Sequence, residues 1–255
     1  MDARRGTLGG MEHDGGLLRP EGLQASLFFE TPEQMYARVF RQLKPRTAVP
    51  EIGVEFCRFA NVDSFIHLEN GRLRVRISDL LAGAPAPVAE SLAFILLGKL
   101  YRKRVPRLYS HRYRLYLNRR DIRRQAHLVR QIRGRKFISG PQGEHRNLEE
   151  LFERLNRQFF DGLMGRPRLG WSRQASRTML GHFDPSHQAI VINRIFDDPA
   201  VPALALEYVM FHEMLHLRYP VEHSGAKRRV HTAQFRAAEI QFPELIQAKE
   251  IIKRL

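Results

Sequence analysis

The segment His212-Glu213-Met214-Leu215-His216 combines two imidazoles and a carboxylate in a pattern that can bind a metal ion. In an α-helix, residues four positions apart lie on the same face, so both imidazoles can reach one Zn²⁺ ion. The same geometry places the Glu213 carboxylate beside a zinc-activated water, whose proton it can take and pass to a leaving amine. The motif therefore predicts a zinc site that hydrolyses peptide bonds.

The residues around this motif favour a metal site over the alternative, a helix whose two histidines are ordinary core or surface residues. Residues 209–211 and Leu217 are uncharged, as a buried helix requires, and Arg218 ends the apolar pattern. Residues 201–217 are apolar on nearly every side. We therefore expect a buried central helix that ends at Pro220.

A catalytic zinc site needs three protein ligands and one open position, so a third ligand must be found. The single cysteine, Cys57, excludes a multi-cysteine site, which leaves histidine and carboxylate as ligands. The metzincin spacing fails, because Glu222 occupies the position of its third histidine. Two candidates stay open: Glu239, as in gluzincin-type sites, and His231 at the start of an expected helix.

Other elements must position this helix, and residues 144–255 are expected to form one domain around it. A capping pattern at Asn147 begins a helix whose apolar residues recur at helical spacing up to about residue 160. Two strands are expected over residues 178–183 and 189–193, and two helices follow the motif. The first covers about residues 232–241, and the second runs from residue 244 to the end.

Over about residues 145–242, these features resemble the SprT-like (Spartan-type) zinc metalloproteases. After HExxH and a variable stretch, that family has a third histidine with phenylalanine four residues later, as His231 and Phe235 stand here. Three upstream segments are also similar, namely Leu155-Asn156-Arg157-Gln158-Phe159-Phe160, Leu180-Gly181-His182-Phe183 and Ile190-Val191-Ile192-Asn193.

The resemblance implies a zincin-like fold in which His212, His216 and His231 bind Zn²⁺ and Glu213 is the catalytic base. We favour His231 over Glu239 as third ligand, because a histidine at a helix start can swing to the metal of the preceding helix. Glu239 can instead form a hydrogen bond with a ligand imidazole. Three other histidines are expected in loops or at the sheet rim: His182, His187 and His223.

The N-terminal part of the sequence is divided into a flexible lead, residues 1–26, and a small α+β domain of unknown role, residues 27–100. A capping pattern at Thr31 predicts a helix before Pro45. Alternating apolar residues and an Asn70-Gly71 turn predict a small antiparallel sheet over about residues 52–77, and a mostly apolar helix follows.

Positive charge is concentrated in residues 101–143, which we expect to form a basic helical connector. Between residues 101 and 140, fourteen Lys and Arg face one acid, Asp121, for a local charge of +13 out of +15 overall. Interleaved tyrosines favour contact with DNA or RNA. The alternative is a solvated helix whose arginines pair with acids elsewhere. The candidate contact residues are Arg112, Arg114, Arg119, Arg120, Arg123, Arg124 and Arg130.

The composition excludes global disorder, because 43% of residues are apolar and 27% are charged. The longest apolar run, residues 92–97, is far shorter than the roughly 20 residues of a membrane span. Residues 1–20 mix charges with glycines and show no signal-peptide pattern. We expect a cytosolic protein without a membrane segment.

Together these features predict an α+β protein with a C-terminal zincin-like domain. In chain order, this domain is expected to contain a helix, a small antiparallel sheet, the buried HExxH helix and C-terminal helices. The predicted function is a zinc endopeptidase that acts on protein or peptide substrates, including nucleic-acid-associated proteins. Two alternatives stay open. One is a nucleic-acid-binding protein with a structural or inactive zincin domain, and the other is a different zinc hydrolase that uses the same helix.

Overall fold

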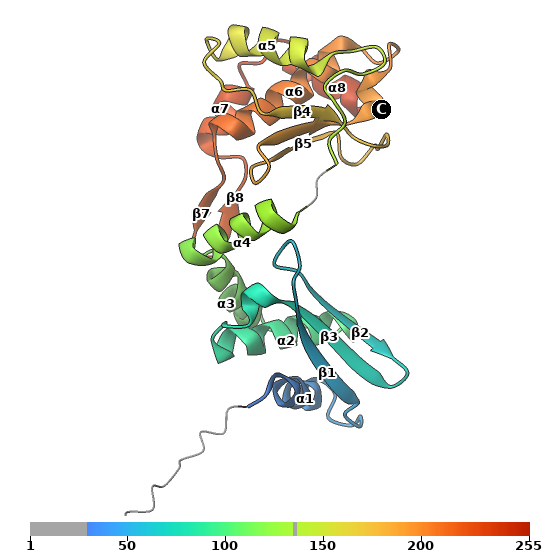
Figure 1. Ribbon diagram of the computed structural model, residues 1–255, viewed down its shortest axis with the longest axis vertical. Helices are drawn as coiled ribbons and strands as arrows, with labels where there is room; N and C mark the ends of the chain where they lie inside the picture. Colours follow the sequence, from blue (N-terminus) through green and yellow to red (C-terminus); the bar gives the residue numbers. More distant parts are fainter. Residues whose placement is uncertain (1–29, 135–136) are drawn as a thin grey trace, which may run out of the picture. The chain divides into compact units, whose positions relative to one another are not determined.

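The computed structural model describes residues 30–134 and 137–255 (Figure 1). The predicted lead, residues 1–26, lies outside the described residues. The described part of the chain is a mixed α+β structure with eight α-helices and small sheets, as predicted. Pro32–Leu255 forms one unit by its internal contacts, and the domain boundary near residue 143 stays a prediction.

The N-terminal region begins with helix α1, Pro32–Leu43, and continues into a three-stranded sheet. Its strands are β1 (Glu51–Cys57), β2 (Ser64–Glu69) and β3 (Arg72–Ser78), in the order β1-β3-β2. Strands β2 and β3 are antiparallel, but β1 and β3 are parallel, so the prediction of an antiparallel sheet is wrong for β1. Strand β3 takes the centre because its apolar face is the most deeply buried.

Helices cover this sheet and lead into the basic segment. After the short 3₁₀ helix η1 (Asp79–Leu81), α2 (Ala86–Leu100) packs with α1 against the buried face of β3 in one apolar cluster. The basic segment then forms α3 (Arg107–Leu117) and α4 (Arg120–Arg133), in agreement with its predicted helical character.

The C-terminal region begins with α5 (Leu148–Phe159), whose cap is Asn147 as predicted: its side chain accepts hydrogen bonds from two backbone amides of the first turn. Strands β4 (Arg168–Trp171), β5 (Gly181–Asp184) and β6 (Ala189–Ile192) form a sheet in the order β4-β6-β5. Strand β5 is antiparallel to β6, but β4 is parallel to it. The sheet is therefore mixed rather than antiparallel, because the fully buried β6 lies between β4 and β5 and pairs with them in opposite senses.

Helix α6 (Ala203–Arg218) is the predicted central helix, and it contains the HExxH motif. A short 3₁₀ helix, η2 (Arg194–Asp197), precedes it. A hairpin of β7 (Glu222–Ser224) and β8 (Lys227–Arg229) follows it, and then α7 (Ala233–Glu239) and α8 (Leu245–Lys253) complete the chain.

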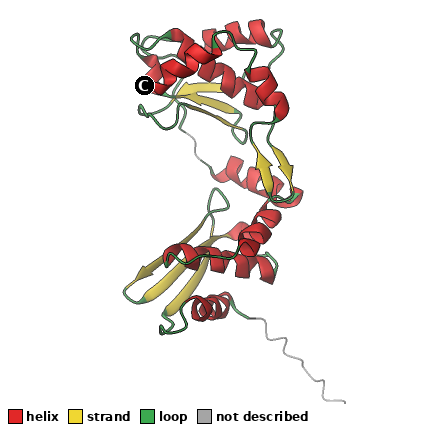
Figure 2. Ribbon diagram, turned by 180° about the vertical axis from the view of Figure 1, so that it is seen from behind, coloured by secondary structure: helices red, strands yellow, loops and turns green. Residues whose placement is uncertain are grey.

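Around α6, the sheet and helices α5, α7 and α8 contribute to one continuous apolar core. Figure 2 shows the helices and small sheet of this region. Trp171, Phe196, Phe211 and Phe235 are almost completely buried in it. Burial of large side chains on this scale holds α6 rigidly. No helix in the described residues has the length and apolar character that crossing a membrane requires.

Candidate metal centre

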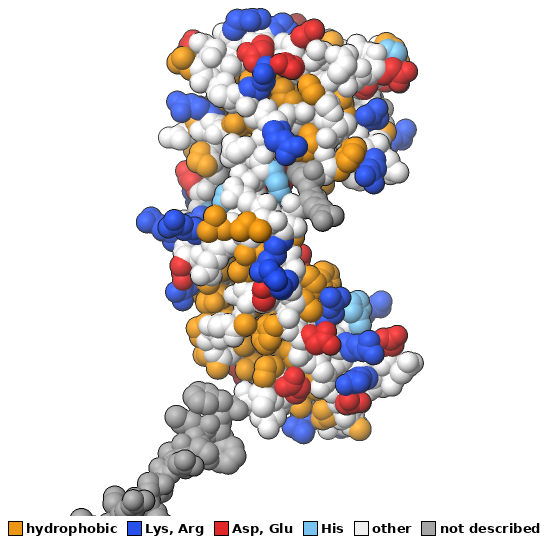
Figure 3. Space-filling view, viewed as in Figure 1, with side chains coloured by type: hydrophobic (Ala, Val, Ile, Leu, Met, Phe, Trp, Pro, Cys, Tyr) orange, Lys and Arg blue, Asp and Glu red, His pale blue; other side chains and the backbone are white. Residues whose placement is uncertain are grey.

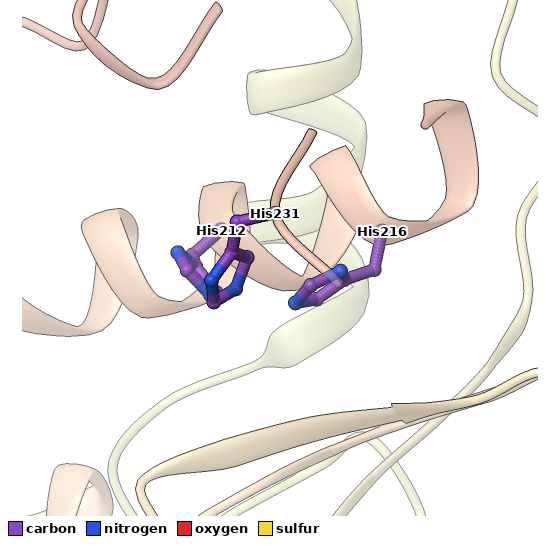
Figure 4. Close-up of side chains that lie close together, drawn as sticks. All are labelled: His212, His216 and His231. Atoms are coloured by element: carbon purple, nitrogen blue, oxygen red, sulfur yellow. The ribbon is translucent and has the colours of Figure 1, made fainter. Parts of the chain in front are cut away.

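Three histidines converge at the surface of α6 (Figure 4). His212 and His216 lie one turn apart on that helix, and His231 comes from the segment between β8 and α7. One ring nitrogen from each lies within 4.8 Å of the others. Such a spacing suits a shared ion, and an all-imidazole donor set suits zinc.

The ring of Phe235 packs against all three imidazoles. It is fully buried, and its ring centroid lies 5.0, 4.7 and 4.6 Å from those of His212, His216 and His231. Its position depends on the start of α7, where the Thr232 hydroxyl accepts a hydrogen bond from the Phe235 amide at 3.1 Å. The four-residue spacing between His231 and Phe235 therefore joins a candidate metal ligand to the ring that packs against it.

Glu239 is not part of the three-histidine cluster, but it contacts the Nδ1 atom of His212. Its Oε1 lies 2.8 Å from Nδ1 of His212 and accepts a hydrogen bond from the Tyr208 hydroxyl at 2.9 Å. Burial acts to raise the pKa of Glu239, but the hydrogen bonds from His212 and Tyr208 outweigh it and lower the pKa. An ionised Glu239 holds the proton of His212 on Nδ1, which leaves Nε2 with a lone pair for a metal.

The electrostatic environment keeps the two α6 imidazoles neutral. Burial lowers the pKa of His212 despite the opposing effect of Glu239. Burial, followed by the proximity of His212 and His231, lowers the pKa of His216 to about 4. Since metals bind neutral imidazole, both side chains are in the metal-binding form at neutral pH.

The carboxylate of Glu213 lies between α6 and strand β5. Its residue is buried, with 6% of its surface exposed. A Cβ atom placed on Gly181 of β5 would lie 3.1 Å from Glu213 Oε1 and 2.9 Å from a methyl group of Val209. Glycine at position 181 thus lets the strand approach the helix and brings backbone close to the carboxylate.

A cleft of about 810 Å³ opens over the cluster. The three histidines and Glu213 line it, together with residues 181–183 of β5, the segment around the β7–β8 hairpin, and one face of α4. Strand β5 is an edge strand, because among the described residues it pairs with β6 alone. The cleft thus combines a metal-binding cluster, a carboxylate and an open strand edge.

The three histidines that were expected in loops or at the sheet rim lie outside the cluster. His182 is on β5 and lines the cleft, and His223 is on β7 with Nδ1 3.2 Å from Oδ1 of Asn118. His187 follows β5, where its Nδ1 lies 3.1 Å from a carboxylate oxygen of the buried Asp184.

The seven candidate arginines fall into two groups. Three pair with acids, as the solvated-helix alternative requires: Arg112 with Glu90, Arg119 with Asp121 and Arg130 with Asp184. A fourth, Arg114, donates a hydrogen bond to the Ser110 carbonyl. The other three, Arg120, Arg123 and Arg124, line the cleft over the histidines. Four of the seven arginines therefore have contacts within the chain, and three line the cleft beside the histidines.

Sequence reasoning missed two features of this site. Tyr208 lies four residues before His212, and that spacing on a buried helix was the available signal for its contact with Glu239. The α4 wall of the cleft had no sequence signal, because it depends on tertiary contacts. Asn118 makes one of them, donating a hydrogen bond to the Gly225 carbonyl in the hairpin at 2.8 Å.

Comparison with known proteins agrees with this site. A model of the SprT-like family matches residues 148–249, which run from the start of α5 into α8. The matched segment contains the three clustered histidines, Glu213 and Glu239. No curated protein and no solved structure matches the chain.

Proposed function

We propose that the chain is a zinc-dependent endopeptidase with His212, His216 and His231 as ligands, and the match of residues 148–249 to the SprT-like family model supports this. The observation that carries the proposal is the convergence of three imidazoles beside the buried carboxylate of Glu213 in one cleft. Three histidines with space on the cleft side match the donor set of catalytic zinc.

Each side chain has a distinct task in the proposed reaction. Zinc, when bound, supplies Lewis acidity, which lowers the pKa of water and polarises a peptide carbonyl. Glu213 accepts the proton of the attacking water and passes it to the nitrogen of the leaving amine. Glu239 orients His212 through Nδ1, so the imidazole keeps the correct tautomer.

The open edge of β5 supports a polypeptide as the substrate. An extended chain can add to an exposed strand edge through backbone hydrogen bonds. At β5 this addition would place a peptide bond beside Glu213, because residues 181–183 line the same cleft as the carboxylate. An unfolded segment fits this arrangement better than a folded surface, because its backbone groups are free to pair.

The proposal is tested by incubating the full-length, zinc-loaded protein with an unfolded polypeptide and identifying new chain termini by mass spectrometry. We expect internal cleavage that stops with a chelator and returns when zinc is added. The His212→Ala variant serves as the control for contaminating proteases, and it should not cleave. Cleavage that continues in His212→Ala or in the chelator would contradict the proposal.

We also propose that residues 101–140 contact nucleic acid, although fewer of their arginines are available than the sequence alone indicates. Internal ion pairs engage Arg112, Arg119 and Arg130. Binding through the remaining cations should weaken steeply with salt, because each neutralised phosphate releases counterions. If neither DNA nor RNA binds at low salt, this part of the proposal fails and the peptidase proposal is unaffected.

A further inference from the structure

One wall of the metal cleft is a row of arginines on α4. Arg120, Arg123 and Arg124 have the i, i+3, i+4 spacing that places side chains on one face of a helix. All three line the cleft together with the three histidines and Glu213. Whatever occupies the cleft next to the metal cluster therefore also meets these guanidinium groups.

These three arginines have no carboxylate or hydrogen-bond partner in residues 30–134 and 137–255. Their neighbours do: Arg119 pairs with Asp121 at 2.7 Å, and Arg133 with Asp79 at 2.8 Å. The Nε of Arg123 is even buried without a hydrogen-bond acceptor. A buried donor without an acceptor is costly, so a ligand that supplies an acceptor there gains affinity.

The charge of the cleft is strongly unbalanced. Arg228 of β8 joins the three α4 arginines in its lining, whereas Glu213 is the only carboxylate there among the described residues. The positive field reaches His223, whose pKa falls through burial and then through Arg123 and Arg228. Figure 3 shows Lys and Arg side chains gathered at the level of α4 and the hairpin. An anionic ligand group fits this environment.

Hydrogen bonds fix the α4 wall to the metal-site region at both ends. At one end, Arg130 contacts the buried Asp184 at 3.3 Å, and Nδ1 of His127 lies 3.2 Å from the Ser186 hydroxyl. At the other end, Asn118 bonds the hairpin. Contacts at both ends hold α4 beside the cleft that its arginines line.

We propose that Arg120, Arg123 and Arg124 make the enzyme select polypeptides with acidic side chains near the cleaved bond. Four helical residues advance about 6 Å, close to the roughly 6.6 Å between side chains on the same side of an extended chain. Two of the arginines thus match Asp or Glu residues two positions apart. This inference rests on the proposed peptidase function and adds its substrate class.

An acidic peptide fits the cleft better than a nucleic acid. Single-stranded nucleic acid is bound through aromatic side chains that stack on successive bases. Phe183 is the only Phe, Tyr or Trp in the cleft lining among the described residues. Carboxylates need only the planar guanidinium groups that the cleft supplies, which bind them through two parallel hydrogen bonds.

Measuring peptide binding to an inactive variant tests this inference independently of catalysis. The zinc-loaded full-length Glu213→Gln variant, which should not cleave, is titrated with two fluorescent peptides that carry either Asp-Ala-Asp or Asn-Ala-Asn in the same sequence. We expect the acidic peptide to bind at least about tenfold more tightly, with a preference that falls as salt is added. Equal affinities would overturn the inference and leave the proposed peptidase function intact.

Two further variants in the same background identify the side chains responsible. Replacing the exposed Arg120 and Arg124 together by glutamine should remove most of the preference without weakening binding of the neutral peptide. Arg124→Glu should weaken binding of the acidic peptide more than Arg124→Gln does, because it adds a repelling carboxylate. Replacing Arg104 and Arg107 together by glutamine, an equal loss of charge outside the cleft, should keep the full preference.

The active enzyme gives the second readout. For wild type, kcat/KM should be about tenfold higher for the acidic peptide, and the double glutamine variant should cleave both peptides at similar rates. A double variant that keeps the preference would contradict the inference, because the arginines would then be structural. If those substitutions reduce binding of an oligonucleotide but not peptide discrimination, the α4 wall serves nucleic acid instead.

Discussion

His231 and Glu239 were the two candidates for the third ligand, and the structure gives them different positions. His231 joins the cluster with His212 and His216, and Glu239 bonds the outer nitrogen of His212. Removal of a ligand should weaken metal binding more than removal of a carboxylate that only orients a ligand. The two roles can therefore be separated by measuring zinc.

Removing each side chain should affect zinc differently. We expect His231→Ala to lose stoichiometric zinc, because two histidines do not complete the site. Glu239→Gln should keep one zinc per chain with about 10- to 100-fold lower affinity, since an amide orients His212 less firmly. Metal analysis after dialysis against a competing chelator measures both. Loss of stoichiometric zinc in Glu239→Gln but not in His231→Ala would reverse the assignment.

Much of this site could be predicted at the level of residues, because helical spacing alone places His212 and His216 together. The position of His231 could not be predicted from spacing. Fourteen residues lie between it and His216, and the β7–β8 hairpin within them has polar three-residue strands without an apolar alternation. Family resemblance supplied what local pattern lacked.

At the scale of elements, α7 places His231 through the packing of Phe235 under the three imidazoles. We expect Phe235→Ala to lower the free energy of unfolding by about 3–5 kcal/mol, because it leaves a cavity in the core. Zinc affinity should fall as well. Chemical denaturation measures the first effect, with Ile240→Ala, 72% exposed at the end of α7, as the control that should change little. Equal effects of the two substitutions would show that Phe235 is not a core support.

Strand β5 approaches α6 closely at Gly181. We expect Gly181→Ala to keep its zinc but to lower kcat, because the added Cβ would lie 2.9 Å from Val209 and 3.1 Å from Glu213 and would displace the carboxylate. Gly165→Ala is the matched control, since its Cβ would meet nothing within 4 Å. Unchanged kcat in Gly181→Ala would show that the contact with Glu213 has no catalytic role.

The pairing of the strands was the least predictable property of the elements. Apolar alternation located β1, β2 and β3, but it carries no information on which edges pair, and β1 proved parallel to β3. Strand β4 (Arg168–Trp171) was missed because Gly170, a residue type that is rare in strands, interrupts it, whereas β6 of the same length is an unbroken apolar run. Helices were predicted well, since caps such as Asn147 and Thr232 act locally.

At the scale of the whole molecule, the three proposed zinc ligands come from two segments, which a bound ion would link. Ligands that bind only the folded state stabilise it by mass action. Free zinc at about 100 times its dissociation constant should add about 2.7 kcal/mol, or roughly 5–10 °C in Tm for a chain of this size.

Thermal unfolding with and without zinc measures this stabilisation. His231→Ala should lose most of the zinc-dependent shift in Tm, and Arg107→Gln, on α3, should keep it. A wild-type Tm that does not respond to zinc would show that the three histidines do not bind the ion in the folded chain.

The central claim is that Glu213 works as a base beside a zinc ion held by three histidines. The most direct test compares peptide hydrolysis by wild type and Glu213→Gln after metal analysis of the same samples. We expect equal zinc contents, with hydrolysis about 10²- to 10⁴-fold slower in the variant, because glutamine fills the same space without accepting a proton. Equal rates of hydrolysis at equal zinc content would contradict the account.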